Sequence, residues 1–266
     1  MFDCHLHSNF SGDSQMSVDE ACEKAISLGL KGIAFTDHLD YDYPDYEEVF
    51  MINFDQYSKF MDQTKLKYNH RLKVLKGIEV GIQPHVLADS EQVVTGYDFD
   101  FVIGSTHIID KLDPYTGSYF AGKTKKQSDT RYLEEVLFAV ENFKNYDVVG
   151  HIGYIRRYNQ CDDKTLRYVD YHDLIDTILK TVIRDGKGIE VNTSGFKGIL
   201  NTPIPDFDIL KRYKELGGEI ITLGSDAHSA EHIALNFNFV KDQLKQIGFK
   251  TVTYFEKRKP VFINIE

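Results

Sequence analysis

Two histidines near the start of the chain, His5 and His7, have the spacing of a metal-binding pair. Side chains two residues apart in an extended strand point to the same side, so both imidazoles can reach one ion. Taken alone, an H-x-H pair is a weak indication, because hydrogen-bonded and exposed histidines are common. The interpretation therefore depends on what the rest of the chain places beside the pair.

Further polar residues stand where other apolar segments end. Six of the ten histidines lie at such positions, accompanied by carboxylates. In chain order the residues are His5, His7, Asp37, His38, Glu79, His107, His151, Asn192, Asp226 and His228. Glu79 is the most informative of them, because an unpaired charge at the end of a buried strand is costly unless a cation or hydrogen bonds compensate it. The pattern predicts a metal site built from the ends of several strands.

Three of the polar residues have an alternative interpretation. Asp13 follows the histidine pair in a short loop and is either a further metal ligand or a helix cap or loop hydrogen-bond partner. Asp37 either caps the following turn or holds a ligand histidine in place. Asn192 is interpreted as turn chemistry, because Thr193 and Ser194 follow it.

The mixture of imidazole and carboxylate, with no thiolate, suits Zn, Mn or Fe and does not distinguish among them. The candidate ligands outnumber the three or four that one catalytic zinc takes, so we expect two or three divalent ions per chain. A hydroxide between two such ions can attack a phosphate ester while the ions polarise its oxygens. The sequence contains no G-x-S-x-G elbow, Walker A loop or G-x-G-x-x-G fingerprint after a strand that would indicate a competing chemistry.

Basic residues that could bind a phosphate follow His151. Arg156 and Arg157 lie five and six positions beyond it, and a guanidinium matches phosphate geometry in a bidentate way. We expect at least one of them to face the site, with surface charge as the alternative for each. The segment from Asp110 to Ser128 is long for a connection between a strand and a helix, and it is either a substrate-covering lid or a solvated loop.

The elements that must position these residues alternate between strand-like and helix-like patterns. Seven strands are expected at Met1–Leu6, Gly32–Phe35, Val74–Glu79, Phe99–Ser105, Val148–Gly150, Gly188–Val191 and Glu219–Leu223. Helices are expected from a Ser17 cap to Gly29 and at Phe54–Tyr68, Tyr132–Phe143, Tyr171–Arg184, Phe207–Leu216 and Glu231–Ile247. Polar residues end every strand, which favours an α/β barrel with one mouth over an open sheet with one switch point.

Composition limits the class of protein. The chain has 266 residues and a formal net charge of −10, which argues against nucleic acid as a partner. No apolar run reaches the roughly 18 residues of a membrane-spanning helix, and no basic or apolar leader precedes His5, so we expect no membrane partner and a cytoplasmic protein. Three scattered cysteines and the lack of a linker-like stretch indicate a single domain, 1–266, without a disulfide framework.

Together these motifs resemble the PHP (polymerase and histidinol phosphatase) family, and within it the histidinol-phosphate phosphatases. The resemblance covers nearly the whole chain through Asp3–His7, Phe35–His38, Gly77–Glu79, Ser105–His107, Gly150–His151 and Ser225–His228. It implies a distorted (β/α)7 barrel, similar to a TIM barrel, with a trinuclear metal site. One ion would be held by His5, His7, Glu79 and Asp226, a second by Glu79, His107 and His151, and a third by Asp13, His38 and His228.

The resemblance also implies an activity: a metal-bridging hydroxide hydrolyses L-histidinol phosphate to L-histidinol and inorganic phosphate, in histidine biosynthesis. Glu79, Asp226 and His228 are the expected catalytic residues, and Arg156 or Arg157 the expected phosphate contact. The alternatives are a PHP phosphoesterase acting on nucleotides or other small phosphate monoesters, an exonuclease module, and a non-catalytic metal-dependent scaffold or sensor.

Overall fold

The computed structural model describes residues 1–46 and 49–265. Its strands are β1 (Phe2–Leu6), β2 (Gly32–Phe35), β3 (His38–Leu39), β4 (Lys73–Gly81), β5 (Phe101–Ser105), β6 (Val148–Val149), β7 (Gly188–Asn192), β8 (Ile221–Gly224), β9 (Thr251–Glu256) and β10 (Lys259–Asn264). The α-helices are α1 (Val18–Ser27), α2 (Phe54–Tyr68), α3 (Leu87–Gly96), α4 (Lys125–Asn142), α5 (His172–Arg184), α6 (Phe207–Glu215) and α7 (Phe237–Ile247). Among these residues, no helix combines the length and apolar character needed to cross a bilayer.

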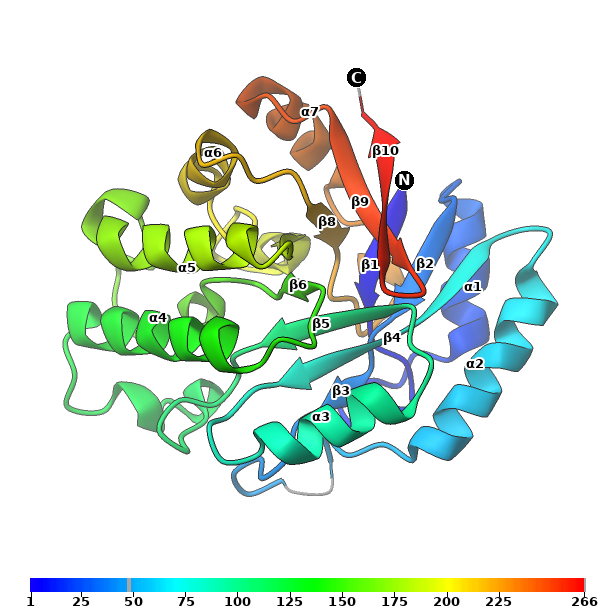
Figure 1. The fold of residues 1–266 in the computed structure, drawn as a ribbon, viewed down its shortest axis with the longest axis horizontal. Coiled ribbons are helices and arrows are strands. Elements are labelled where there is room, and N and C mark those ends of the chain that lie inside the picture. Colours follow the sequence, from blue (N-terminus) through cyan, green and yellow to red (C-terminus); the bar gives the residue numbers. More distant parts are fainter. Residues whose placement is uncertain (47–48, 266) are drawn as a thin grey trace.

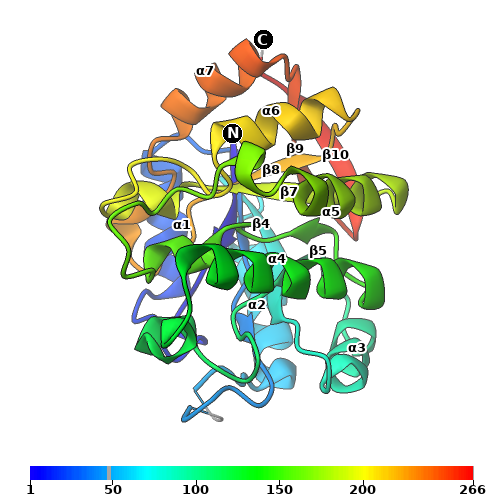
Figure 2. The same cartoon turned by 90° about the vertical axis from the view of Figure 1, so that its left-hand side faces the viewer.

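The sheet is parallel and follows the chain in the order β1-β2-β4-β5-β6-β7-β8, with the short β3 also paired to β4. The last of these strands returns to the first: the residues just after β8 pair with the end of β1 through an isolated parallel bridge between Leu6 and Ala227. Helices surround the strands on the outside (Figures 1 and 2). The expected α/β barrel with seven principal strands is confirmed, and all seven strands lie within two residues of their predicted positions.

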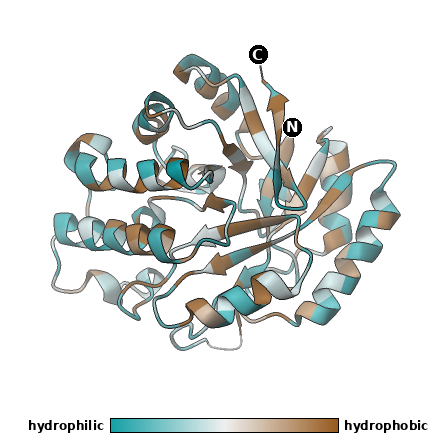
Figure 3. Cartoon of the chain, viewed as in Figure 1, coloured by the Kyte–Doolittle hydropathy of each residue, from teal (hydrophilic) through white to brown (hydrophobic). Residues whose placement is uncertain are grey.

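The strands are apolar and buried because helices cover their outer faces (Figure 3). The Ser17 hydroxyl accepts a hydrogen bond from the Glu20 backbone N–H at the start of α1, and Gly29 adopts φ 70° just beyond its end, as the sequence predicts. Two predicted helix starts are wrong. Helix α4 begins at Lys125 rather than Tyr132, and α7 begins at Phe237 rather than Glu231, because Ala234 and Asn236 take left-handed backbone angles that interrupt a helix.

A C-terminal hairpin, β9–β10, covers the end of the barrel opposite to the predicted ligands. Phe255 stacks on Phe101 at a ring-centroid distance of 5.2 Å. At the hairpin turn, Lys257 N–H donates to Asp100 Oδ1, and Arg258 Nε lies 2.6 Å from Asp147 Oδ2. Asp100 and Asp147 stand directly before β5 and β6, so the hairpin ties down the ends at which these strands begin.

Candidate metal centre

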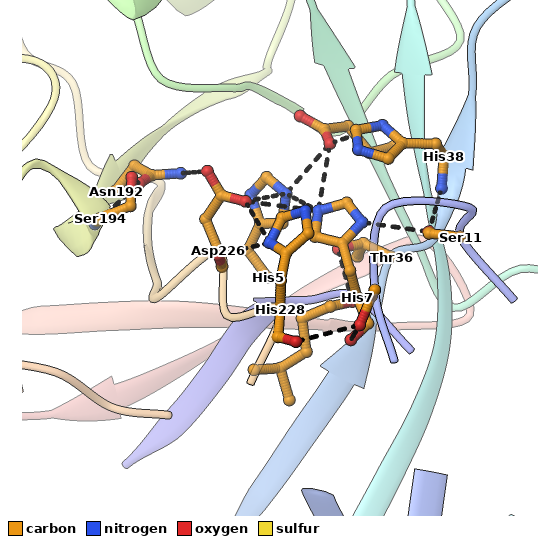
Figure 4. A network of polar contacts seen from close by, with 12 residues as sticks. His5, His7, Ser11, Thr36, His38, Asn192, Ser194, Asp226 and His228 are labelled. Atoms are coloured by element: carbon orange, nitrogen blue, oxygen red, sulfur yellow. Dashed lines mark hydrogen bonds and ion pairs between the residues drawn. The ribbon is translucent and has the colours of Figure 1, made fainter. Parts of the chain in front are cut away.

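The ends of the strands converge on one site at the open end of the barrel. The junction between β1 and the residues after β8 is fixed by two backbone hydrogen bonds, Asp226 N–H to His5 O at 2.8 Å and His7 N–H to Ala227 O at 3.0 Å. Asp226 has φ 53°, a left-handed angle that is uncommon for a non-glycine residue. The side chains of His5, His7, His228 and Asp226 point toward one another (Figure 4).

The first group of ligand atoms is centred on His5 and His7. Their Nε2 atoms are 3.0 Å apart and lie 3.2 and 3.4 Å from Glu79 Oε2. Asp226 Oδ1 completes the group at 3.8 and 3.4 Å from the same two nitrogens. All four side chains are buried.

A second group uses the other oxygen of the same carboxylate. Glu79 Oε1 lies 3.2 Å from His107 Nε2 and 2.8 Å from His151 Nε2, and these two nitrogens are 3.4 Å apart. The Ser105 hydroxyl donates to Glu79 Oε1 at 2.7 Å. Glu79 therefore stands between the two groups, and His38 also reaches it, with Nδ1 3.3 Å from Oε2.

The third group lies toward the rim. Asp13 Oδ2 is 2.9 Å from His228 Nε2 and 3.5 Å from His38 Nε2. The ring of His7 stacks between those of His38 and His228, at centroid distances of 4.2 and 4.3 Å. The structure thus brings all nine residues predicted as metal ligands into one continuous cluster.

These groups fit divalent cations. Ligands about 2.1 Å from a tetrahedral ion lie about 3.4 Å apart, close to the 3.0–3.8 Å separations in the first group. His5 Nδ1 lies 2.6 Å from Glu190 Oε1, and His107 Nδ1 lies 2.7 Å from Asp40 Oδ1. When Nδ1–H donates to a carboxylate, the Nε2 lone pair of the neutral ring is left free to bind a metal ion.

The carboxylates at the centre of the cluster are held in their charged form. Burial alone would raise the pKa of Glu79, but the imidazoles of His5 and His107 hold it well below its ordinary range. Burial would likewise raise the pKa of Asp226, and Arg157 and His5 hold it well below its ordinary range. Burial, with the neighbouring His38 and His228, lowers the pKa of His7 to about 3, so this ring is a neutral ligand at physiological pH. The cluster is therefore set up as anionic carboxylates around at least one neutral imidazole.

Asp37 and Asn192, which also stand at strand ends, hold the site together. Asp37 accepts hydrogen bonds from the backbone N–H and the hydroxyl of both Ser8 and Ser11, and the Ser11 hydroxyl lies 3.3 Å from His7 Nδ1. Asn192 makes the expected turn contact with the Ser194 backbone N–H, and its amide also donates to Asp226 Oδ2 at 3.3 Å. Both residues therefore serve the loops and the ligands at once.

The adjacent arginines have different positions. Arg157 lines the cavity above the cluster, and its Nη2 donates to Asp226 Oδ2 at 2.6 Å and to the Ser194 hydroxyl. Arg156 is buried away from that cavity, where Nη1 lies 3.0 Å from Asp206 Oδ2 and Nε donates to Lys164 O. Successive residues of a tight helical turn point in different directions, so Arg157 faces the cavity and Arg156 does not, and the phosphate contact stays a prediction for Arg157.

The cavity has a volume of about 410 Å³ and its floor is the metal-ligand cluster. Its walls are largely aromatic, formed by Tyr43, Tyr46, Phe50, Tyr115, Tyr154 and Tyr158. Asp113, a carboxylate that is only 3% exposed, also lines it. Asp113 and Tyr115 come from the long segment 110–128, whereas Lys123 and Lys125 of that segment donate to backbone oxygens of Tyr119 and Thr165.

Sequence reasoning missed Glu190, Asp40 and Asp113. Glu190 carried a usable signal, since it is a charged residue inside the buried strand β7, like Glu79 in β4. Gly224 leaves room for it, because a Cβ there would lie 2.2 Å from Glu190 Oε1. Asp113 carried no such signal, because its position depends on how a long loop folds back over the barrel.

Comparison with known proteins identifies relatives along the whole chain. Residues 3–194 match the model of the PHP domain. The chain is 35% identical over 260 residues to a probable histidinol-phosphatase of Clostridium acetobutylicum, which covers 97% of this chain and 98% of the relative. It is 31% identical over 258 residues to a histidinol-phosphatase of Lactococcus lactis subsp. lactis, covering 97% and 95% of the two chains.

A solved structure agrees with these relatives. The crystal structure of histidinol phosphate phosphatase from Lactococcus lactis subsp. lactis, complexed with Zn, L-histidinol and phosphate, superposes with a TM-score of 0.92. The two sequences are 31% identical, and the match covers 98% of each chain.

Proposed function

This chain belongs to the PHP domain family, and on that premise we propose that it hydrolyses L-histidinol phosphate to L-histidinol and inorganic phosphate. One observation carries the proposal: histidines and carboxylates from several strand ends gather at the floor of a single cavity, in overlapping groups that could hold an ion, two of which include Glu79. The similarity to a phosphatase solved with Zn, L-histidinol and phosphate supports both the metal and the substrate. A place in histidine biosynthesis and in the cytoplasm is part of the same proposal, supported by the names of the relatives.

The nine ligand residues would hold two or three divalent ions, with Zn, Mn and Fe all compatible with the donor set. Such ions supply positive charge and Lewis acidity, which acidify water and polarise a phosphoryl group. Glu79 is the shared ligand, since each of its oxygens faces a different group. Loss of the Glu79 carboxylate would therefore disturb more than one ion position.

Arg157 is proposed to bind the phosphoryl oxygens. Its side-chain hydrogen bonds to the described residues all use Nη2, which leaves Nε and Nη1 available to an anion in the cavity. Burial would lower the pKa of Arg157, but Asp226 and the neighbouring tyrosines raise it, so the guanidinium stays charged. A fixed positive charge at this place stabilises the negative charge of the phosphoryl group as the ester bond breaks.

Asp226 and His228 are proposed to handle protons. Asp226 lies between Arg157 and the pair His5 and His7, where it can receive a proton from an attacking water. His228 stands nearer the opening, with 31% of its side chain exposed, and when the third position holds no ion it can supply a proton to the departing alkoxide. These two assignments place the base deep in the cavity and the acid at its rim.

The cavity walls suit the organic part of the substrate. L-Histidinol carries an amine and an imidazole, and both are cationic when protonated. A buried carboxylate attracts such cations, and tyrosine faces attract them as well. We therefore propose that Asp113 and the tyrosines around it bind this end of the substrate, which would favour it over nucleotides and other monoesters.

The test is phosphate release from a panel of esters by metal-loaded protein. We expect kcat/KM for L-histidinol phosphate to exceed that for AMP or phenyl phosphate by about two orders of magnitude, the discrimination that unpaired buried polar groups can supply. Glu79→Gln should abolish release, and Asp42→Asn, a surface change on the same side, should not. Equal activity on all esters would favour the general phosphoesterase, and a preference for single-stranded DNA would favour an exonuclease.

A further inference from the structure

A buried carboxylate that belongs to none of the three ligand groups lies behind two of them. Asp40 follows β3 directly and is 1% exposed. Its Oδ1 is 2.7 Å from His107 Nδ1, and its Oδ2 is 3.2 Å from His38 Nδ1. The two histidines come from different strand ends, so one carboxylate connects side chains that are far apart in the sequence.

The opposite nitrogen of each ring faces a different candidate ion position. His107 Nε2 points to Glu79 Oε1 and His151, in the second group. His38 Nε2 points to Asp13 Oδ2, in the third group. A carboxylate that accepts from Nδ1–H fixes both the tautomer and the orientation of an imidazole ligand and makes Nε2 a stronger donor to a metal. Asp40 is hydrogen-bonded to His107 in this way, and it lies within ion-pair distance of the same nitrogen of His38.

The surrounding backbone is shaped to receive this carboxylate. A Cβ on Gly81 would lie 1.8 Å from Asp40 Oδ1 and 2.4 Å from its Cγ, so only glycine leaves the space. The Asp40 backbone N–H donates to Phe50 O at 3.1 Å, which fixes the residue from the other side. Neither Asp40 Oδ2 nor His38 Nδ1 has a hydrogen-bond partner among the described residues, so their 3.2 Å contact is an ion pair, and Glu79 Oε2 lies 3.3 Å from the same nitrogen.

Asp40 does not line the cavity, and it therefore does not touch a substrate bound there. We propose that Asp40 is a positioning residue that orients His107 and His38 together, so that a single carboxylate sets the metal affinity of two neighbouring positions. The inference rests on the metal-binding part of the proposed function and requires nothing of the substrate. The rings of His5 and His7 do not contact Asp40, because Glu190 and Ser11 contact their Nδ1 atoms instead.

The test measures zinc binding by chelator-treated protein, in competition with a chromogenic chelator, with bound zinc counted by elemental analysis. Relative to the unchanged protein, Asp40→Ala should weaken two of the zinc positions by about 10- to 100-fold, the usual effect of removing such a partner, and should leave the position built on His5 and His7 unchanged. Asp40→Asn should weaken one position more than the other, because an amide presents an acceptor to one ring and a donor to the other.

Two glycine variants test whether the exact placement of the Asp40 carboxylate matters, or only its presence. Gly81→Ala keeps Asp40 but displaces its carboxylate, and should reproduce the loss of zinc affinity. Gly96→Ala is the matched control, since nothing lies within 4 Å of a Cβ there, and Asp42→Asn removes a comparable but exposed carboxylate paired with His85. Neither control should alter zinc binding.

The outcomes are distinguishable from those of the activity assay. If Asp40→Asn and Gly81→Ala bind zinc with unchanged stoichiometry and affinity, the inference is overturned, even if the melting temperature of the metal-free protein falls, because Asp40 would then be only structural. If zinc affinity falls as expected but L-histidinol phosphate is not hydrolysed by the unchanged protein, the proposed function fails and the inference stands.

Discussion

The contrast between Arg157 and Arg156 gives the sharpest test of the proposed site. The two residues are adjacent and chemically identical, but only Arg157 lines the cavity. Lysine in place of either keeps the positive charge and removes the planar guanidinium fork. Both variants keep the charge, so comparing Arg157→Lys with Arg156→Lys tests at which of the two positions activity requires a guanidinium.

The magnitudes follow from the contacts. Arg157 has two nitrogens available to phosphoryl oxygens, and a lysine would replace a bidentate contact by a single one. A charge-assisted hydrogen bond contributes about 1.5–3 kcal/mol, so Arg157→Lys should lower kcat/KM roughly 10- to 150-fold. Arg156→Lys should leave kcat/KM nearly unchanged but should weaken the buried contacts with Asp206 and Lys164 O. A loss of about 1–2 kcal/mol in the free energy of unfolding would lower the melting temperature by roughly 2–8 °C.

The assay is steady-state phosphate release from L-histidinol phosphate, with thermal unfolding of the same metal-loaded samples. Circular dichroism of Arg157→Lys should match that of the unchanged protein. The reasoning would be refuted if Arg157→Lys kept full kcat/KM, or if Arg156→Lys lost as much activity without any loss of stability.

Three further predictions concern the substrate, the metal and pH. Asp113→Asn should raise KM for L-histidinol phosphate by about tenfold, the effect of one lost charged contact, and leave kcat for phenyl phosphate unchanged in steady-state assays; an unaltered KM would exclude Asp113 from substrate binding. Dialysis against a chelator should abolish turnover, and added Zn, Mn or Fe should restore it; failure to recover activity in a sample that is still folded would contradict the metal mechanism. Burial raises the pKa of Asp3 from 3.8 to about 6 against the opposing hydrogen bonds from Ser225, Ala234 and His5, so the folded chain binds the proton more tightly than the unfolded chain. Relative to Asp3→Asn, the metal-free protein should therefore lose about 2 kcal/mol of unfolding free energy as pH rises from about 4 to 6. Urea titration measures this loss, and a difference independent of pH would contradict the assignment.

The positions of the barrel strands could be predicted from the sequence, because burial on both faces leaves a continuous apolar run, as in Ile33–Phe35 and Val148–Val149. The hairpin β9–β10 could not be predicted in this way. The turn of that hairpin is Lys257-Arg258, both with positive φ, whereas the recognisable turn pairs contain Asn, Asp or Gly. Arg258 is held there by Asp147, a contact between residues 111 positions apart, which no local pattern reports.

Helices were missed for a different reason. Helix α3 has no side-chain cap and buries only Ser90 and Val94, so its sequence shows little of the periodicity that reveals a helix. The first turns of α4 are polar, and their only signal was the capping box of Thr124 and Gln127, which the structure shows in full. Periodicity thus located helices with apolar faces and overlooked those without.

In the candidate site, the positions that were predicted are those that a strand end imposes. His5, Glu79 and Asp226 could be expected to meet because parallel strands deliver their last residues to one mouth. The partners of the ligands were harder to find. Asp40 stands two residues beyond His38 and resembles an ordinary loop aspartate in the sequence, and its role emerges only when His107 and Gly81 are brought beside it.

The aromatic wall of the cavity has a spectroscopic consequence. The chain contains 16 tyrosines and no tryptophan, so its intrinsic emission carries no indole signal. Phe50 lies edge-on to the ring of His38, with centroids 5.1 Å apart, and lines the cavity. A single tryptophan introduced there would be the sole long-wavelength fluorophore of the molecule, and its quenching would report the arrival of a ligand in real time without any label.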